Sequence, residues 1–308
     1  MGGSSFSYSD WDSKKTTYTS KSTSSIFSSS KLSTDLDPSK MKNMCRESCD
    51  SDANPESTPI IIGLDCTGSM GMIPDNLIRE GLGELFNEIY TRKPVSDPHV
   101  LFAAFGDVVV GDPGPLQIGQ FEAGVDELTS TLEKIWLNGC CGGGNNQESA
   151  DLIYYFAANM TKHDSFLKRG KKGFIFTISD EPTGEVLKPD HIEKLFGFRP
   201  ESDAHLEDIM AQVRRTYEPF HIIIEEGSHV RHHGLDAVYT PWKRLLGENV
   251  ILCSDHRKLP EIITSILQVK SGVDKKSVSS SWDGSTSLVV DRAISGLSVI
   301  AKDEGLVF

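Results

Sequence analysis

The sequence predicts an α/β fold in which helices cover both faces of a mostly parallel sheet. Two observations support this prediction. Short apolar runs, each long enough for one buried strand, alternate along the chain with segments whose apolar residues recur at helical spacing. Polar loops follow several of the apolar runs, as expected where a buried strand ends and the connection to the next parallel strand begins.

The first half of the chain contains three predicted strands and two predicted helices. Residues 59–64 (PIIIGL) form a continuous apolar run that ends in a polar loop, which is typical of a strand buried on both faces. Helical spacing follows over residues 78–89. Residues 99–105 predict a second buried strand, and the alternation over 116–121 predicts an edge strand. A second helix is expected over residues 125–136.

The second half continues the alternation. We expect, in order, a helix over 150–160, a strand over 173–178, a helix over 206–217, strands over 220–224 and 250–253, and a last helix through 262–267. In folds of this kind the functional site lies beyond the carboxyl ends of the central strands. Functional residues are therefore expected in the loops at that edge.

The alternating pattern occupies residues 58–271, and the two ends of the chain lack it. Residues 1–57 are rich in Ser and Thr and have no apolar period, so we expect a disordered N-terminal arm. Residues 272–308 begin with small polar residues and regain apolar ones from Leu288 onward. A linker and a short apolar tail, which packs on the body or on a partner, are expected there.

The composition excludes several classes of function. The chain has 44 acidic against 31 basic residues, a net charge of −13, and no basic cluster, which is unfavourable for nucleic acid and for anionic lipid. No apolar run approaches the roughly 18–20 residues of a membrane span, and the N-terminus does not resemble a secretory signal. Six cysteines in a chain of this length are not a disulfide framework, so a cytoplasmic location is expected.

Oxygen donors follow the first predicted strand. Asp65, Thr67 and Ser69 occupy alternate positions of one short loop, from which a carboxylate and two hydroxyls can converge on one point. Donors of this kind suit Mg²⁺, which prefers oxygen ligands in octahedral geometry. The alternative interpretation is that Thr67 and Ser69 only cap the helix that follows.

Two further loops favour the metal interpretation. Asn145 follows the glycines of residues 142–144, and Asp180 follows the strand over 173–178. Both positions fall at the same edge of the predicted sheet as Asp65. Asn146 or Gln147 could take the place of Asn145 as the ligand from its loop.

These motifs resemble the von Willebrand factor type A family, and in particular its metal-ion-dependent adhesion site. The Asp-x-Ser/Thr-x-Ser loop of the family is matched by Asp65, Thr67 and Ser69, and its Asp after the fourth strand by Asp180. Where the family has Thr or Asp after a Gly-rich loop, this sequence has Asn145, whose amide oxygen can also coordinate Mg²⁺. The resemblance covers residues 58–271. It implies a three-layer, Rossmann-like fold with one antiparallel edge strand.

The resemblance also implies how the site works. Thr67 and Ser69 are expected to ligate Mg²⁺ or Mn²⁺ directly, while Asp65 and Asp180 act largely through water. These two carboxylates only balance the cation, so the metal stays electrophilic and can accept an Asp or Glu carboxylate of a protein partner. The expected function is a metal-dependent protein-interaction module. Intracellular members of the family often act beside AAA+ ATPases, which makes such a complex a candidate partner.

Two other functions stay open. A structural or assembly protein, for example a virion-associated one, would use the metal only to shape a loop. A Mg²⁺-dependent hydrolase of the haloacid dehalogenase type would need a general acid two residues after Asp65, where Thr67 cannot do this work. No enzymatic activity and no catalytic residue are therefore expected.

Two remaining features have simpler interpretations. The segment His229-x-x-His232-His233 has metal-like spacing, but no cysteine or acidic pair accompanies it at zinc-ligand spacing, so we interpret it as a solvated loop. Glu148 opens the third predicted helix and is interpreted as a charge favoured by the helix dipole.

Overall fold

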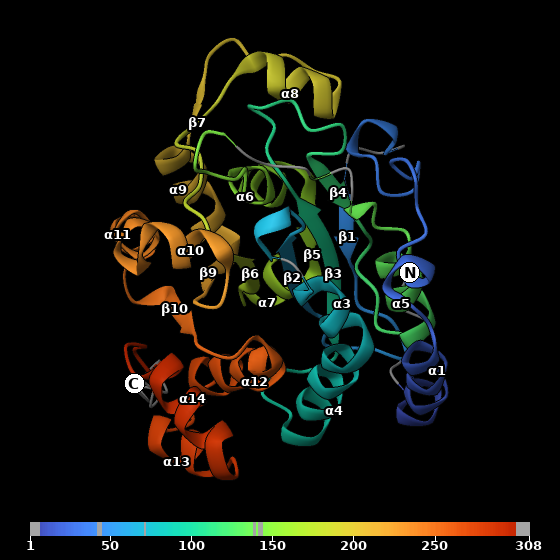
Figure 1. Ribbon diagram of the computed structural model, residues 1–308. Helices are drawn as coiled ribbons and strands as arrows, with labels where there is room; N and C mark the ends of the chain where they lie inside the picture. The colour runs from blue at the N-terminus through green and yellow to red at the C-terminus, as the bar shows by residue number, and fades with distance from the viewer. Residues whose placement is uncertain (1–6, 42–44, 71, 138–139, 141–143, 300–308) are drawn as a thin grey trace, which may run out of the picture.

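A six-stranded sheet forms the centre of the computed structural model, which describes residues 7–41, 45–70, 72–137, 140 and 144–299 (Figure 1). From one edge to the other the strands are β10 (Val250–Cys253), β9 (Tyr217–Ile224), β6 (Gly173–Ser179), β2 (Thr58–Asp65), β3 (Pro98–Phe105) and β4 (Leu116–Ile118). Neighbouring strands are parallel except for β4, which runs antiparallel to β3. The predicted fold class, with a mostly parallel sheet and one antiparallel edge strand, is confirmed.

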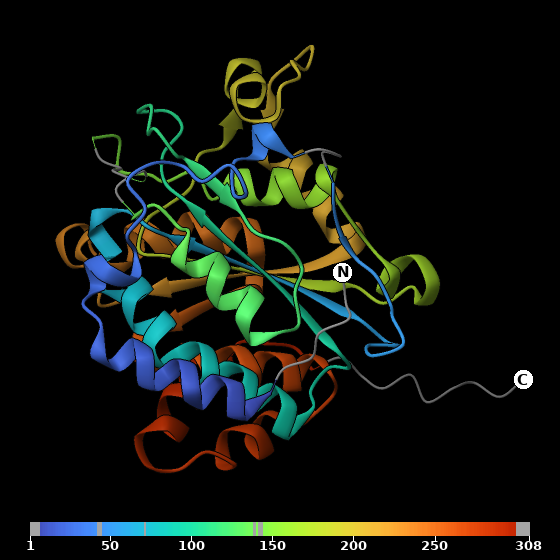
Figure 2. The same ribbon diagram turned by 90° about the vertical axis from the view of Figure 1, so that its right-hand side faces the viewer.

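Helices cover both faces of this sheet (Figures 1 and 2). The α-helices of the described residues are α1 (Tyr8–Ser20), α2 (Thr23–Ile26), α3 (Ile73–Asn76), α4 (Leu82–Arg92), α5 (Val125–Glu133), α6 (Asp151–Met160), α7 (Asp164–Arg169), α8 (Pro189–Phe196), α9 (Leu206–Thr216), α10 (Ser228–His233), α11 (Leu235–Leu246), α12 (Leu259–Lys270), α13 (Lys275–Ser280) and α14 (Gly284–Ile294). Two small ribbons lie outside the main sheet. β1 (Arg46–Ser48) pairs in parallel with β5 (Thr161–His163), and β7 (Val186–Leu187) pairs with β8 (Ala204–His205) in antiparallel fashion.

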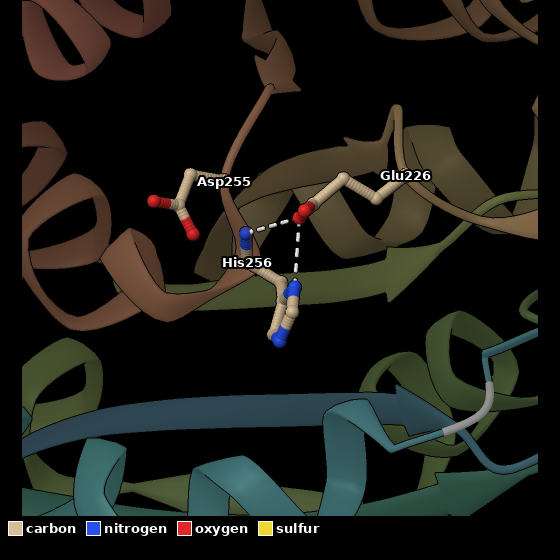
Figure 3. A group of neighbouring side chains, drawn as sticks. All are labelled: Glu226, Asp255 and His256. Carbon is tan, nitrogen blue, oxygen red and sulfur yellow. Dashed lines mark hydrogen bonds and ion pairs between the residues drawn. The ribbon is translucent and has the colours of Figure 1, made fainter.

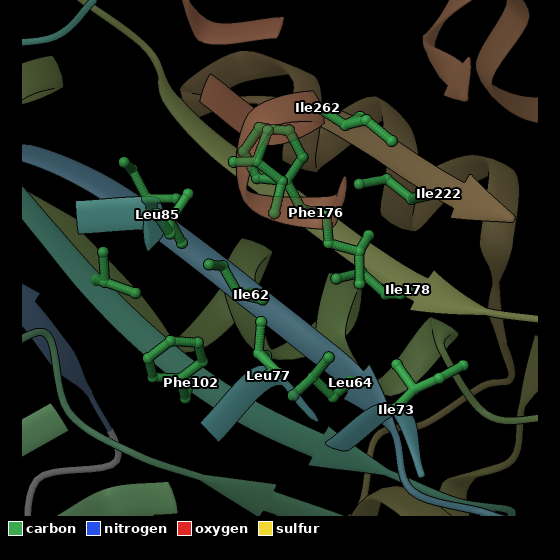
Figure 4. Packing of buried hydrophobic residues seen from close by; sticks show 14 of the residues in the cluster. Ile62, Leu64, Ile73, Leu77, Leu85, Phe102, Phe176, Ile178, Ile222 and Ile262 are labelled. Carbon is green, nitrogen blue, oxygen red and sulfur yellow. The ribbon is translucent and has the colours of Figure 1, made fainter. Parts of the chain in front are cut away.

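The two faces of the sheet bury separate apolar cores, because successive side chains of a strand point to opposite faces. Ile62 and Leu64 of β2 contribute to the core beneath α4 and α12, together with Phe102, Phe176 and Ile222 of the neighbouring strands (Figure 4). Ile61 lies in the second core, which α6, α9 and α11 cover. This double burial explains why the strands are apolar at nearly every position.

Helix α6 approaches the sheet closely at Gly63. A Cβ at this position would lie 3.0 Å from a side-chain carbon of Ile153. The absence of a side chain at residue 63 therefore sets the depth at which α6 packs, and α6 follows directly on the loop that contains Asn145 and Glu148.

Much of the N-terminal segment is ordered, which departs from the disordered arm expected over residues 1–57. Helix α1 is capped by Ser7, whose hydroxyl accepts the Asp10 N–H, and it lies alongside α4 (Figure 2). The Trp11 side chain is only 2% exposed. A Cβ at Gly83 would lie 1.6 Å from the Trp11 Nε1, so the glycine provides the space for the indole.

Further along, the same segment is fixed to helix α7. Asp50 accepts two hydrogen bonds from Arg169, at 2.7 and 3.1 Å, and two from Ser57. The pKa of Asp50 is held below its ordinary value, chiefly by Arg169. The sequence alone does not predict these contacts, because single aromatic or acidic residues in a Ser-rich segment are usually solvated.

The C-terminal segment also packs on the body. Helices α13 and α14 occupy most of the expected linker, and Val290 and Ile294 join the core beneath α4 and α12. The Arg92 guanidinium of α4 stacks 3.5 Å from the centre of the Trp282 ring. The last apolar residues of the expected tail, 300–308, lie outside the described residues. Among the described residues, no helix combines the length and the apolar character that crossing a membrane requires.

Candidate metal centre

The loop after β2 begins with a carboxylate that is completely buried. Asp65 Oδ1 accepts the Thr67 backbone N–H at 2.8 Å and the Thr67 hydroxyl at 2.6 Å, which folds the loop into a tight turn. Its other oxygen, Oδ2, accepts the Ser179 hydroxyl at 2.6 Å. Burial raises the pKa of Asp65 to about 6, and nearby Asp180 acts in the same direction.

A continuous chain of oxygen atoms connects Asp65 with Asp180. The Thr67 and Ser69 hydroxyl oxygens are 3.1 Å apart, and the Ser69 hydroxyl donates to Asp180 Oδ1 at 2.6 Å. The structure thus brings together four of the five residues that the sequence predicts as metal ligands. They lie at the carboxyl ends of β2 and β6, as expected for neighbouring parallel strands.

Asp180 is held from the other side by the loop after β9. The His229 backbone N–H donates to Asp180 Oδ2 at 2.8 Å. Gly227 makes this approach possible, because a Cβ there would lie only 2.2 Å from the Asp180 Cβ. One Asp180 oxygen therefore faces Ser69 and the other is fixed by backbone.

Asn145, the fifth predicted ligand, is bonded to a different carboxylate. Its amide nitrogen donates to Asp107, which follows β3 and also accepts the Val109 N–H at 2.7 Å. The Asn145 amide oxygen is buried and has no hydrogen-bond partner. This arrangement fixes the amide and leaves its oxygen available to a cation. Of the preceding glycines, residues 142 and 143 lie outside the described residues.

Glu148 differs from its expected role at a helix end. Its side chain is 1% exposed, and neither carboxyl oxygen has a hydrogen-bond partner. Burial raises the pKa of Glu148 to about 11, and the carboxylates of Asp65, Glu181 and Asp107 contribute in the same direction. The pKa of Glu181 is likewise raised to about 7, first by burial and then by Asp65 and Asp180.

The residues fit a divalent cation on two grounds. Asp65, Thr67, Ser69 and Asp180 are all oxygen donors, the ligand type that Mg²⁺ prefers. Buried oxygens of Asn145 and Glu148 have no partner, although burying unpaired polar groups is costly. A bound cation would satisfy both and would reduce the mutual repulsion of the carboxylates.

The histidine segment has a supporting position beside this site. Apart from the backbone bond of His229 to Asp180, the His229 ring stacks on His233 with centres 4.3 Å apart, and His232 is bonded to the Ser228 carbonyl. The His229 Nδ1 lies 3.4 Å from Glu181 Oε1. The three rings therefore do not converge as a zinc site would require.

A second group of potential ligands lies at the ends of β9 and β10 (Figure 3). Glu226, Asp255 and His256 have ligand atoms within 4.8 Å of one another. Glu226 accepts hydrogen bonds from the His256 backbone N–H and from the His256 ring Nδ1, each at 2.7 Å. The ring Nε2 of His256 is hydrogen-bonded to Asn76. Asp255 forms an ion pair with Arg257. These groups satisfy one another without a cation.

Sequence reasoning missed the residues that position the ligands. Ser179, Gly227 and His229 hold the two aspartates, and Asp107 holds Asn145. Ser179 and Asp107 follow predicted strands at the correct edge, which was a usable signal. The backbone donation by His229 and the closeness of Gly227 depend on tertiary contacts and leave no local pattern.

The sequence matches no protein-family model, and it matches no curated protein. Among solved structures, the pilus adhesin SpaC from Lactobacillus rhamnosus GG in its open conformation is similar, with a TM-score of 0.48 and 8% identity over 72% of this chain and 31% of that one. Proximal thread matrix protein 1 from the mussel byssus gives a TM-score of 0.43 with 9% identity, over 72% of this chain and 48% of that one.

A structure described as von Willebrand factor type A from Catenulispora acidiphila has a TM-score of 0.38 and 12% identity, over 71% of this chain and 44% of that one. The chain therefore spans less than half the length of each of these three proteins. At such identities the likeness concerns the fold alone.

Proposed function

We propose that this chain is a metal-dependent protein-interaction module of the von Willebrand factor type A kind. The observation that supports the proposal is the chain of close oxygen contacts through Asp65, Thr67, Ser69 and Asp180 at the carboxyl edge of the sheet. Two hydroxyls and two carboxylates in this arrangement are suitable ligands for Mg²⁺ or Mn²⁺. Asn145, with its unpaired amide oxygen, would complete the set from the third loop.

The proposed partner is a protein that offers an Asp or Glu carboxylate. Asp65 and Asp180 together contribute two negative charges, which balance a divalent cation without exceeding it. An open coordination position would then attract an oxygen anion. A component of an AAA+ ATPase complex is one proposed partner, and the cytoplasm is the proposed location. No enzymatic step is proposed, because Thr67 stands where a phosphatase of the haloacid dehalogenase type would need its general acid.

Calorimetric titration with Mg²⁺ tests the metal site. Asp65→Ala removes the carboxylate that organises the loop, so we expect no measurable Mg²⁺ binding while the fold survives. Glu226→Ala serves as the control, because it removes the carboxylate at the centre of the second ligand group. Unchanged Mg²⁺ affinity in Asp65→Ala, or its loss in Glu226→Ala alone, would place the cation elsewhere.

Capture of a partner from cell extract tests the interaction. The net charge of −13 repels an acidic partner at long range, so the local metal must overcome that background. We expect capture to be lost in chelator and in Asp65→Ala, and to change little or increase at moderate salt. Binding that persists in chelator and weakens steeply with salt would contradict the proposal.

A further inference from the structure

Glu148 is a buried carboxyl group that nothing in the described structure satisfies. Its side chain is 1% exposed, and both carboxyl oxygens lack a hydrogen-bond partner. Burying such a group without a partner is costly even when it is neutral, and costs more when it is charged. A function that uses the group would account for its retention.

Backbone pairing places Glu148 beside the loop of Asp180. Its N–H donates to the Pro182 carbonyl at 2.9 Å, and its own carbonyl accepts the Gly184 N–H at 3.3 Å. Glu148 is thereby bridged in parallel to Thr183, three residues after Asp180. These main-chain hydrogen bonds fix the backbone of Glu148 relative to the loop that contains Asp180.

The Glu148 carboxyl group lies within electrostatic range of the carboxylates of the site. Burial is the main cause of its raised pKa, and the charges of Asp65, Glu181 and Asp107 follow in that order. The Glu148 side chain does not cap α6, since neither of its oxygens has a hydrogen-bond partner. The first N–H of α6, that of Asp151, is instead accepted by the Thr183 hydroxyl at 3.1 Å.

We propose that Glu148 is a further ligand of the cation held by Asp65, Thr67, Ser69 and Asp180. The inference rests on the proposed metal-dependent function and goes beyond the set of ligands expected from the sequence. A third carboxylate around a divalent cation strengthens its hold, since affinity in oxygen sites depends on the number of charged ligands. The additional negative charge also weakens the attraction of the metal for an incoming carboxylate.

Mg²⁺ titration of Glu148→Gln tests the inference. This substitution keeps the shape of the side chain but cannot supply a carboxylate to the cation, so we expect the Mg²⁺ affinity to fall about tenfold or more. Asp151→Asn is the matched control, because Asp151 is also buried and acidic, lies three residues further on, and has one unpaired carboxyl oxygen. Its Mg²⁺ affinity should stay within about twofold of wild type.

Denaturant unfolding in chelator provides a readout without metal. If Glu148 acts only as a ligand, Glu148→Gln should be at least as stable as wild type in chelator and should gain less stability from added Mg²⁺. Unchanged Mg²⁺ affinity in Glu148→Gln, an equal loss in Asp151→Asn, or a lower stability of Glu148→Gln in chelator would overturn the inference. These outcomes differ from a wild-type protein that binds no Mg²⁺, which would remove the proposed function itself.

Discussion

Gly227 shows how strongly single residues constrain the candidate site. Asp180 is placed between the Ser69 hydroxyl and the His229 backbone N–H, and it reaches this position only because residue 227 has no side chain. The backbone at Gly227 has a φ of −64°, which any residue can adopt, so the requirement concerns space rather than backbone conformation. Ser179 has a comparable role toward Asp65 through its hydroxyl.

Gly227→Ala should therefore displace Asp180. We expect a loss of about 1–3 kcal/mol in the free energy of unfolding from overpacking, and a loss of Mg²⁺ binding. Calorimetry and denaturant unfolding measure the two effects. Gly68→Ala is the control, because Gly68 lies in the same candidate site, in the loop after β2, but a Cβ there would have no atom within 4 Å. Equal behaviour of the two variants would show that Asp180 does not depend on the approach of the β9 loop.

The sequence was sufficient to bring the candidate ligands to one edge of the sheet, but it was insufficient to find the residues that hold them in place. Asp65, Thr67, Ser69 and Asp180 follow buried strands, and strand order alone brings the ends of β2 and β6 together. Glu148 could not be interpreted correctly, because its burial results from the pairing of its backbone with the loop at Thr183. Contacts between distant segments of this kind have no local signature.

At the scale of elements, the predicted strands and the helices next to them agree with the structure. Helix α11 was not predicted because it contains Pro241, which normally interrupts a helix. Helix α1 was not predicted because Trp11 and Tyr18, which are buried, lie in an otherwise polar stretch. Two large aromatics can attach a short helix, although its composition is that of a disordered segment.

Trp11→Ala tests whether α1 contributes to stability. Removing a buried indole should lower the free energy of unfolding by about 3–5 kcal/mol, unless the surrounding structure collapses into the cavity. Thr17→Ala on the exposed side of the same helix is the control and should change it by less than about 0.5 kcal/mol. An unfolding midpoint equal to wild type in Trp11→Ala would indicate that α1 detaches easily, as the expectation of a disordered arm implies.

At the scale of the whole molecule, Asp50 connects the N-terminal segment with helix α7, which is more than 100 residues away in the sequence. Its carboxylate accepts hydrogen bonds from two guanidinium nitrogens of Arg169 and from the Ser57 hydroxyl. The Lys168 Nζ lies 3.3 Å from the same carboxylate. Since the folded protein holds the pKa of Asp50 below its ordinary value, the unfolded chain binds the proton more readily. The stabilisation is thus complete above the unfolded pKa of about 3.9 and is lost as the pH falls further.

Asp50→Asn should reduce the free energy of unfolding by about 2 kcal/mol at pH 7, since it weakens hydrogen bonds to a charged group. The difference from wild type should shrink below about pH 4, where Asp50 itself becomes protonated in the unfolded chain. Urea unfolding at pH 7 and at pH 3 measures both values. Asp52→Asn, at an exposed neighbouring position, should follow wild type throughout. A difference that grows in acid would contradict the assignment.

Helix α4 lies between the two terminal segments, with Trp11 packed at Gly83 and Trp282 stacked on Arg92. A ribosome releases these three parts one after another, and the hydrogen bond from Arg92 to Ser281 joins residues 189 positions apart. During synthesis α1 can pack only after α4 has emerged, and the other side of α4 stays uncovered until α12 and then residue 282 leave the exit tunnel. Long-range contacts of this kind form slowly and leave apolar surface exposed in the meantime. We therefore expect the nascent chain to expose the apolar side of α4 until these later helices have been synthesised.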